Sequence, residues 1–204
     1  MAVKALKGSN VLVGTVIGFP SGSPTVALKV AETIQACKDG ATEIDLVINI
    51  GKALQEDWAY IKDEITVVCE ATYVHRAILK VIFENDFLQE DKHKIKLCEI
   101  CSEIGVDFVK TSTGYGFVKG ENGHYNYHWA THSDLKLLRK HSAPKVQIKA
   151  AGGVRTLEDL LAVKALGVNR VGATATVAMI KAAKEKYGVK SNGAVAANKD
   201  VSGY

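Results

Sequence analysis

Six short runs of β-branched and aliphatic residues alternate with longer amphipathic segments, and this alternation limits the possible folds more than any other feature of the chain. Strands that alternate with helices generally pair in parallel, because each helix carries the chain back to the edge where the previous strand began. The first four runs are nearly continuous in apolar residues, as expected for strands covered on both faces. We predict strands at 11–19, 42–48, 77–83, 107–112, 145–150 and 169–174, and helices at 24–39, 57–73, 90–105, 132–142, 156–167 and 175–187.

The spacing of the repeating units favours a barrel over a doubly wound sheet. The units recur every 25 to 35 residues or so, and no dinucleotide-binding glycine fingerprint follows the first strand. We therefore predict the α/β class and a (β/α)8 TIM barrel, with about six of its βα units in this chain. Residues 1–190 are expected to form a single, N-terminally incomplete barrel domain, since the opening segment resembles the end of a helix that stops at Gly8. Residues 191–204 are poor in large apolar side chains and are expected to form a flexible tail.

The overall charge argues against nucleic acid and membrane partners. Lysine and arginine total 26 against 22 acidic residues, and the net charge of +4 is spread along the chain. No apolar stretch is long enough to span a bilayer, and the N-terminus lacks the pattern of a secretory signal. The four cysteines show no disulfide framework. We expect a soluble cytoplasmic protein with reduced thiols.

Three lysines stand inside otherwise apolar strands: Lys80, Lys110 and Lys149. A buried ammonium is costly unless it is paired or gives up its proton. Any one of them could pair with a carboxylate or extend to the rim, but three in one small core favour a functional role. If Lys110 and Lys149 face the same cavity, each disfavours protonation of the other, so that one can attack a carbonyl as a neutral amine.

Asp45 is the strongest candidate for acid–base chemistry, because a carboxylate is as unusual in an apolar strand as a lysine. Glu43 has the same side-chain parity and is expected on the same face. The structural alternative is a salt bridge between Asp45 and Lys80 or Lys110.

Two neighbouring strand ends carry small residues that suit an anion. Gly152 and Gly153 lie between a strand and a helix that begins at about Thr156, and the next unit offers Gly172 and Thr174 at a similar place. Bare backbone amides at a helix start bind anions, and barrels often bind phosphate near their last two strands. A tight turn is the alternative for the glycine pair alone. Together the two ends predict a phosphorylated substrate.

A long polar and aromatic connection spans 114–133, on the side where barrels place catalytic loops. Tyr125, Tyr127 and Trp129 could close over a substrate or pack between subunits. The four-residue spacing of histidines in this loop (His124, His128, His132) could suit a metal, but no acidic partner is near them in sequence. Cys98 and Cys101 lie in an amphipathic helix without a second pair. We therefore predict no metal site.

Several segments resemble the signature sequences of the deoxyribose-phosphate aldolases, which are class I (Schiff-base) aldolases. They are VGTVIGFPSG (13–22), EIDLVINIG (43–51), LKVIFE (79–84), DFVKTSTG (107–114) and KAAGGVR (149–155), and the similarity is collinear from about Val11 to Tyr187. The resemblance implies reversible cleavage of 2-deoxy-D-ribose 5-phosphate to D-glyceraldehyde 3-phosphate and acetaldehyde, without a metal or an organic cofactor. It implies that Lys110 forms the imine, that Lys149 helps to keep this nucleophile unprotonated, and that Asp45 relays protons. Phosphate contacts would come from Gly114, Gly152, Gly153, Gly172 and Thr174, with Lys80, Arg155 and the terminal Tyr204 as accessory candidates.

The chain also departs from the family pattern. Ala175 stands where a second phosphate-binding hydroxyl is usual, and FEND (83–86) replaces the usual Glu-Thr ending of its strand. The chain resembles a member that lacks the N-terminal helix and the first two strands. Two alternatives therefore stay open: a related Schiff-base aldolase for another phosphorylated sugar, and a catalytically silent phosphosugar-binding or assembly protein with an incomplete barrel. The expected ligand is a small phosphorylated sugar, and a homo-oligomer is an open alternative to a monomer.

Overall fold

The computed structural model describes residues 1–119 and 123–188. Its main sheet has six parallel strands in the order β1-β2-β3-β4-β7-β8. Because this order follows the chain, every connection within the sheet is a βα crossover, as predicted. Each predicted run contains one strand: β1 (Gly14–Ile17), β2 (Glu43–Val47), β3 (Ile78–Ile82), β4 (Phe108–Lys110), β7 (Gln147–Ala151) and β8 (Arg170–Gly172).

Helices follow all six strands, and each predicted segment contains one. Local sequence sets several of their ends: Thr156 and Asp159 form a capping box, and Gly105 and Gly188 end helices in the left-handed conformation. A short helix at 50–54, capped by Asn49, was not predicted. The helices are α1 (Ala2–Ala5), α2 (Val26–Lys38), α3 (Ile50–Leu54), α4 (Trp58–Val74), α5 (Asp91–Ile104), α6 (His132–His141), α7 (Leu157–Ala165) and α8 (Thr176–Tyr187).

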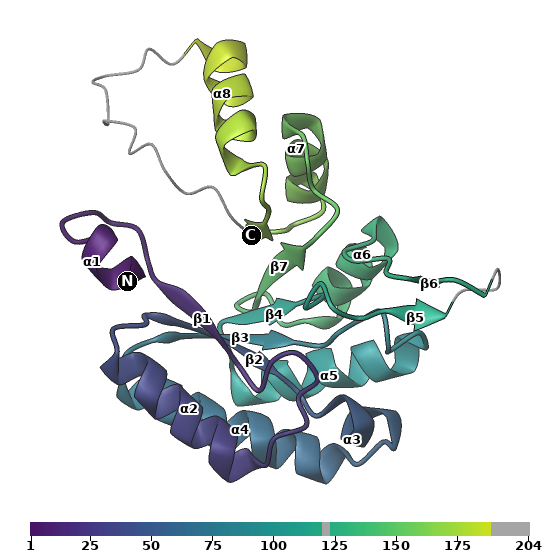
Figure 1. Ribbon diagram of the computed structural model, residues 1–204. Coiled ribbons are helices and arrows are strands. Elements are labelled where there is room, and N and C mark those ends of the chain that lie inside the picture. Colours follow the sequence, from purple (N-terminus) through teal and green to yellow (C-terminus); the bar gives the residue numbers. More distant parts are fainter. Residues whose placement is uncertain (120–122, 189–204) are drawn as a thin grey trace.

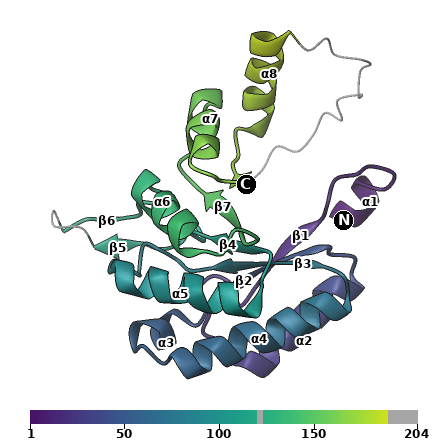
Figure 2. The same cartoon turned by 180° about the vertical axis from the view of Figure 1, so that it is seen from behind.

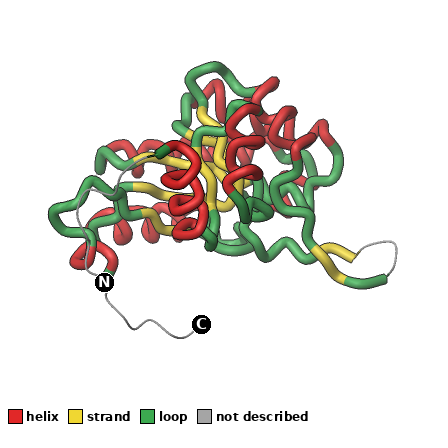
Figure 3. Tube along the Cα trace, turned by 90° about the horizontal axis from the view of Figure 1, so that it is seen from above, coloured by secondary structure: helices red, strands yellow, loops and turns green. Residues whose placement is uncertain are grey.

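The sheet curls, and its helices lie on the outer side of the curl. Figure 1 shows α2, α4 and α5 beneath β1 to β4, whereas α7 and α8 stand beyond β7. The view from behind shows the same layering, and the view from above shows strands bordered by helices (Figures 2 and 3). Within the described residues, β1 and β8 each pair with only one neighbour. The described sheet is therefore a curled, open part of a barrel.

Alternation along the strands separates an apolar outer face from a polar inner face. In β2, Ile44 and Leu46 join the main apolar core, which includes Ile61 and Ile65 of α4. The residues between them, including Asp45, point to the opposite side. The register places the charged residues of neighbouring strands on this same inner face. Apolar packing on the outer face thus stabilises the fold, and the inner face carries the charged residues of the candidate site.

The connection 114–133 contains a small antiparallel pair, β5 (Val118–Lys119) and β6 (Tyr125–Asn126). The opening helix ends at Ala5, earlier than Gly8. The tail expected at 191–204 lies outside the described residues. No helix in the described ranges is both long and apolar enough to cross a membrane.

Candidate functional site

A single carboxylate on β2 gathers three lysines from three other strands. Asp45 Oδ1 lies 2.8 Å from Lys80 Nζ, whereas its Oδ2 lies 2.9 Å from Lys110 Nζ and 2.6 Å from Lys149 Nζ. Lys80 is fully buried, and Asp45 and Lys110 are 5% and 7% exposed. The structure therefore brings together Asp45 and the three lysines that the sequence indicated as candidates for acid–base and nucleophilic roles.

Strand register explains why these side chains meet. Asp45 lies directly opposite Lys80 in the β2–β3 pair, and Lys110 lies opposite Lys149 in the β4–β7 pair. Residues in register on parallel strands point to the same face, so the four side chains converge inside the curl. The salt bridge proposed as the structural alternative for Asp45 is present with both Lys80 and Lys110. Pairing does not exclude chemistry here, since the same carboxylate also contacts Lys149.

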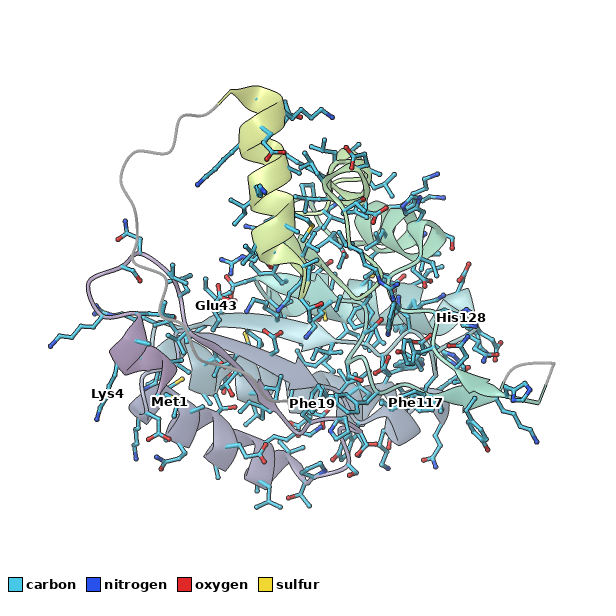
Figure 4. All side chains as sticks on the ribbon, turned by 45° about the horizontal axis from the view of Figure 1, so that its top comes forward. Met1, Lys4, Phe19, Glu43, Phe117 and His128 are labelled. Carbon is cyan, nitrogen blue, oxygen red and sulfur yellow. The ribbon has the colours of Figure 1, made fainter. Side chains whose placement is uncertain are left out.

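A second ionic layer lies beside the first. Glu43 Oε2 is 2.9 Å from Lys80 Nζ, and its Oε1 accepts a hydrogen bond from Arg170 of β8. The Arg170 guanidinium also lies over the Phe108 ring, 5.1 Å from its centroid. Figure 4 labels Glu43 near one end of the sheet, with Phe19, Phe117 and His128 toward the other. Arg170 was not predicted as a site residue, because its partner lies four strands away in the sheet.

The inner face holds more cationic groups than carboxylates. Lys80, Lys110, Lys149 and Arg170 meet only Glu43 and Asp45 in this network. Burial lowers the pKa of Lys149, and the charge of Lys110 lowers it further against the opposing effect of Asp45. Burial would raise the pKa of Asp45, but the three lysines outweigh it and hold that pKa well below its usual range. The cluster thus favours an ionised Asp45 and makes Lys149 easier to deprotonate than an ordinary lysine.

The candidate phosphate residues lie at the ends of β4, β7 and β8. Gly114, Gly152 and Gly153 have φ of +89°, +83° and +81°, a region that favours glycine. The Gly152 amide donates to the Gly172 carbonyl over 3.4 Å, which joins the two adjacent strand ends. Thr174 is exposed just beyond β8.

The two nearby helix starts differ in their openness to an anion. At α7, Asp159 accepts hydrogen bonds from the Arg155 and Thr156 amides, so a carboxylate of the chain already occupies this helix start. At α8, the N-cap residue is Ala175, and no side chain caps the helix. The start of α8 therefore suits an external anion better than the start of α7.

Arg155, one of the accessory candidates, does not join the lysine cluster. Its guanidinium lies over the ring of Trp129, 5.5 Å from the ring centroid. Tyr204 lies outside the described residues. Lys80, the third accessory candidate, belongs to the cluster.

Sequence reasoning missed the role of two buried acidic residues that follow β3. Glu84 accepts hydrogen bonds from both the amide and the hydroxyl of Thr113. Asp86 accepts from the backbone amides of His128 and Trp129. The signal was present in FEND, where two carboxylates directly follow an apolar strand.

Two surface hollows formed by the described residues lie apart from the charged cluster. One of about 590 Å³ lies beside β1 and α2, and another of about 720 Å³ lies beside β5 and α6. Neither is lined by Lys110 or Lys149. We place the site at the cluster, because converging ionisable groups and a perturbed pKa are better indicators of chemistry than the size of a hollow.

Comparison with known proteins places the chain in a family. The description DeoC/LacD family aldolase applies to the family model that matches residues 2–196. The chain belongs to this family. A deoxyribose-phosphate aldolase of Rhodopirellula baltica is 50% identical over 184 residues, which cover 90% of this chain and 72% of the relative. Another, from Clostridium perfringens, is 44% identical over 179 residues, covering 88% and 75%. The predicted family is thus confirmed.

Solved structures agree with the barrel class. A protein provisionally assigned as a deoxyribose-phosphate aldolase from Coccidioides immitis superposes with a TM-score of 0.79 at 32% identity, over 90% of this chain and 68% of that one. The aldolase QR15 gives 0.79 at 29% identity, covering 90% and 77%. A tetrameric deoxyribose phosphate aldolase of Aeropyrum pernix gives 0.74 at 24% identity, covering 91% and 72%, and shows the fold. The predicted TIM-barrel class is confirmed by these neighbours.

Proposed function

We propose that the protein reversibly cleaves 2-deoxy-D-ribose 5-phosphate to D-glyceraldehyde 3-phosphate and acetaldehyde through a lysine Schiff base. The family and the names of the relatives support this substrate. The observation that carries the proposal is the convergence of Lys110 and Lys149 on Oδ2 of one buried carboxylate, Asp45. Burial and the charge of Lys110 lower the pKa of Lys149, so that Lys149 can take up a proton from the neighbouring amine, and a neutral amine is what imine formation requires.

In the proposed mechanism, the Lys110 amine attacks the C1 aldehyde of the open-chain sugar and water is lost to give an iminium. The C3 hydroxyl then gives up its proton, C3 becomes a carbonyl, and the C2–C3 bond breaks. The electron pair of that bond moves into the iminium, which becomes an enamine, and D-glyceraldehyde 3-phosphate leaves. Protonation of the enamine at C2 and addition of water release acetaldehyde and restore the amine.

Asp45 and Lys149 are the groups best placed to move these protons. They lie 2.6 Å apart, and Asp45 also contacts the proposed nucleophile. The lowered pKa of Lys149 lets this amine accept and return a proton nearer neutral pH than an ordinary lysine. The lysines hold the pKa of Asp45 well below its usual range, so Asp45 passes a proton between the two amines without retaining it, and it orients both amines.

The substrate phosphate would bind at the uncapped start of α8, with the backbone of the neighbouring strand ends. The positive end of the helix and its free amides favour a dianion there. The proposed contacts are Gly114, Gly152, Gly153, Gly172 and Thr174. Ala175 supplies no hydroxyl, so the phosphate would rely on backbone amides and Thr174.

Reduction with borohydride in the presence of 2-deoxyribose 5-phosphate tests the proposal. Mass spectrometry should map a reduced adduct to Lys110, and Lys110→Ala should abolish it. An adduct on Lys149 in the unmodified protein would reassign the nucleophile. Absence of any adduct from a chain with a cooperative unfolding transition would favour the silent phosphosugar-binding or assembly alternative, which the open sheet motivates. Competing aldehyde substrates would identify a related aldolase for another phosphorylated sugar.

The proposed setting is the cytoplasm, with a phosphorylated sugar as ligand, a homo-oligomeric assembly and no nucleic-acid or membrane partner. The dispersed net charge of +4 supports the absence of a nucleic-acid partner. The proposed chemistry needs no metal or organic cofactor, because the lysine iminium supplies the electron sink.

A further inference from the structure

The long connection after β4 (114–133) is hydrogen-bonded near both of its ends to one short segment after β3, residues 84–86. Glu84 accepts from the Thr113 amide over 3.0 Å, near the start of the connection. Asp86 accepts from the His128 and Trp129 amides over 2.5 Å and 3.2 Å, near its end. Both carboxyl side chains are buried, Glu84 at 0% and Asp86 at 4% exposure. The segment therefore decides where both ends of the connection lie.

The Glu84 carboxyl group lies close to the backbone of the connection at Gly116. A Cβ on Gly116 would lie 2.8 Å from Cδ of Glu84, so the connection passes over the carboxyl with room only for glycine. Glu84 itself has φ of +61°, which is unfavourable for a residue with a side chain. Burial raises the pKa of Glu84, although its bonds to Thr113 oppose this.

The Asp86 contact places the indole of Trp129 against the Gly152–Gly153 turn, a candidate for phosphate binding. Trp129 has φ of +57°, and its backbone amide and that of His128 both donate to Asp86. A Cβ on Gly152 would lie 2.6 Å from Cγ of the indole, and one on Gly153 would lie 3.7 Å from its Cε3. The indole therefore packs closely on both glycines of the turn.

Other side chains also contact the indole. The Tyr127 ring stacks on it at a centroid distance of 4.3 Å with 29° between planes, and Phe117 meets Tyr127 edge-on at 5.0 Å. The Arg155 guanidinium lies 5.5 Å from the indole centroid. Glycines have no side chains with which to fix their own turn, so this aromatic layer supplies the packing that holds it.

We infer that Asp86 is a positioning residue for substrate phosphate, acting through Trp129, whose indole holds the Gly152–Gly153 turn in its binding shape. The inference rests on the proposed function and deepens it. Loss of Asp86 frees the two amides, lets the indole leave the turn and weakens phosphate binding. The amine chemistry at Lys110 is unaffected, because the lysine cluster contacts neither Asp86 nor Trp129.

A comparison of phosphorylated and unphosphorylated sugar separates this role from general stabilisation. In Asp86→Ala, KM for 2-deoxyribose 5-phosphate should rise about tenfold or more while kcat stays within about twofold, since the affected interaction binds ground state and transition state alike. The kcat/KM for unphosphorylated 2-deoxyribose should not change. Trp129→Ala should behave like Asp86→Ala, and Trp129→Phe should retain part of the affinity, since a ring remains on the turn.

Asp91→Asn is the matched control, because it removes an exposed carboxylate on the next helix, where Asp91 pairs with Lys94. This substitution should leave KM and kcat unchanged for both sugars. An equal loss of kcat/KM for the two sugars in Asp86→Ala, or no loss for either, would overturn the inference.

Tryptophan fluorescence gives a readout that does not depend on turnover. The chain has two tryptophans, so Trp58→Phe leaves Trp129 as the reporter. Inorganic phosphate should change the emission of the Trp58→Phe protein, and adding Asp86→Ala should raise the half-saturating concentration about tenfold, equivalent to about 1.4 kcal/mol. No change in emission with phosphate would overturn the inference even in an active enzyme. If no sugar is cleaved but phosphate still shifts the emission with this Asp86 dependence, the proposed function fails and the positioning role stands.

Discussion

Asp45 is the residue on which the charge balance of the inner face depends. Its carboxylate is the only one in contact with Lys110 and Lys149 within the described part of the chain. Removing one partner of a buried ionic group leaves uncompensated charge, which costs more than the pair contributed. The effect of a substitution here should therefore be large and depend on pH.

Asp45→Asn should lower the free energy of unfolding by about 3–5 kcal/mol at pH 7, because three lysines lose their shared carboxylate. Urea denaturation at several pH values measures this. The deficit should shrink as pH falls below 3.8, the ordinary pKa of the carboxyl group, because the lysines lower the pKa of Asp45 in the folded state and its contribution is lost on protonation. Glu99→Gln, at an exposed helix position, is the control and should change stability by less than about 0.5 kcal/mol. A deficit that does not vary with pH would contradict the electrostatic cause.

Lys149 should make the fold more stable as pH rises. Its folded-state pKa is below the unfolded value of 10.5, so the unfolded chain binds more protons in the interval below 10.5 and stability increases with pH there. Lys149→Met should lack this increase. The difference in unfolding free energy, wild type minus variant, should grow between pH 7 and pH 10 in urea titrations. A difference that is constant or falls would mean that Lys149 is an ordinary charged lysine in the folded protein.

The clustering of the charged residues on the inner face could be predicted from the sequence, but the contacts that support the cluster could not. Asp45, Lys110 and Lys149 were recognisable because charged residues in apolar strands need a reason, and strand parity then predicts that they share a face. The sequence indicated only that Asp86 is an acidic residue directly after an apolar strand. Its hydrogen-bond partners could not be predicted, because these amides lie more than forty residues away in a connection without a regular pattern. Glu43 and Arg170 could not be paired either, because the curl that joins β2 to β8 is a property of the whole sheet.

At the scale of elements, a buried ion pair fixes two helices to the end of β2. Lys29 of α2 donates to Glu64 of α4 over 2.6 Å and to the Val47 carbonyl over 2.8 Å. Glu64 in turn accepts from the Asn49 amide over 2.8 Å. Both side chains are fully buried. The pair thus holds the strand that carries Asp45 from its outer side.

Lys29→Met should destabilise the protein by about 3–5 kcal/mol, since it leaves the Glu64 carboxylate buried without a cation. Lys29→Met combined with Glu64→Gln should recover part of this loss, because no charge then remains and the Gln oxygen can still accept from the Asn49 amide. The comparison of single and double variants by urea denaturation gives the coupling free energy. Additive losses would contradict the ion-pair explanation. Lys62→Met, which removes an exposed partner of Glu103, serves as the surface control.

At the scale of the molecule, the sheet has two edges with unpaired backbone groups. Strands β1 and β8 end the order of the described sheet, and apolar side chains are exposed beside both edges. Val16 of β1 is 41% exposed, and Val177 and Ile180 of α8 are 84% and 51% exposed. Open parallel edges flanked by apolar surface favour pairing with another chain.

We therefore expect the 204-residue polypeptide to associate as its concentration rises. Sedimentation velocity across the micromolar range should show a shift from monomer to larger species. Val177→Lys with Ile180→Lys should weaken association while keeping the fold, because both side chains face solvent on α8 and neither touches the lysine cluster. Leu54→Lys adds the same kind of charge at an exposed position on α3, away from both edges, and should leave association unchanged. If the unmodified chain stays monomeric throughout with a cooperative melting transition, the open edges are stable by themselves. The curl of six strands would then be sufficient to hold Asp45 and its lysines in place without a partner.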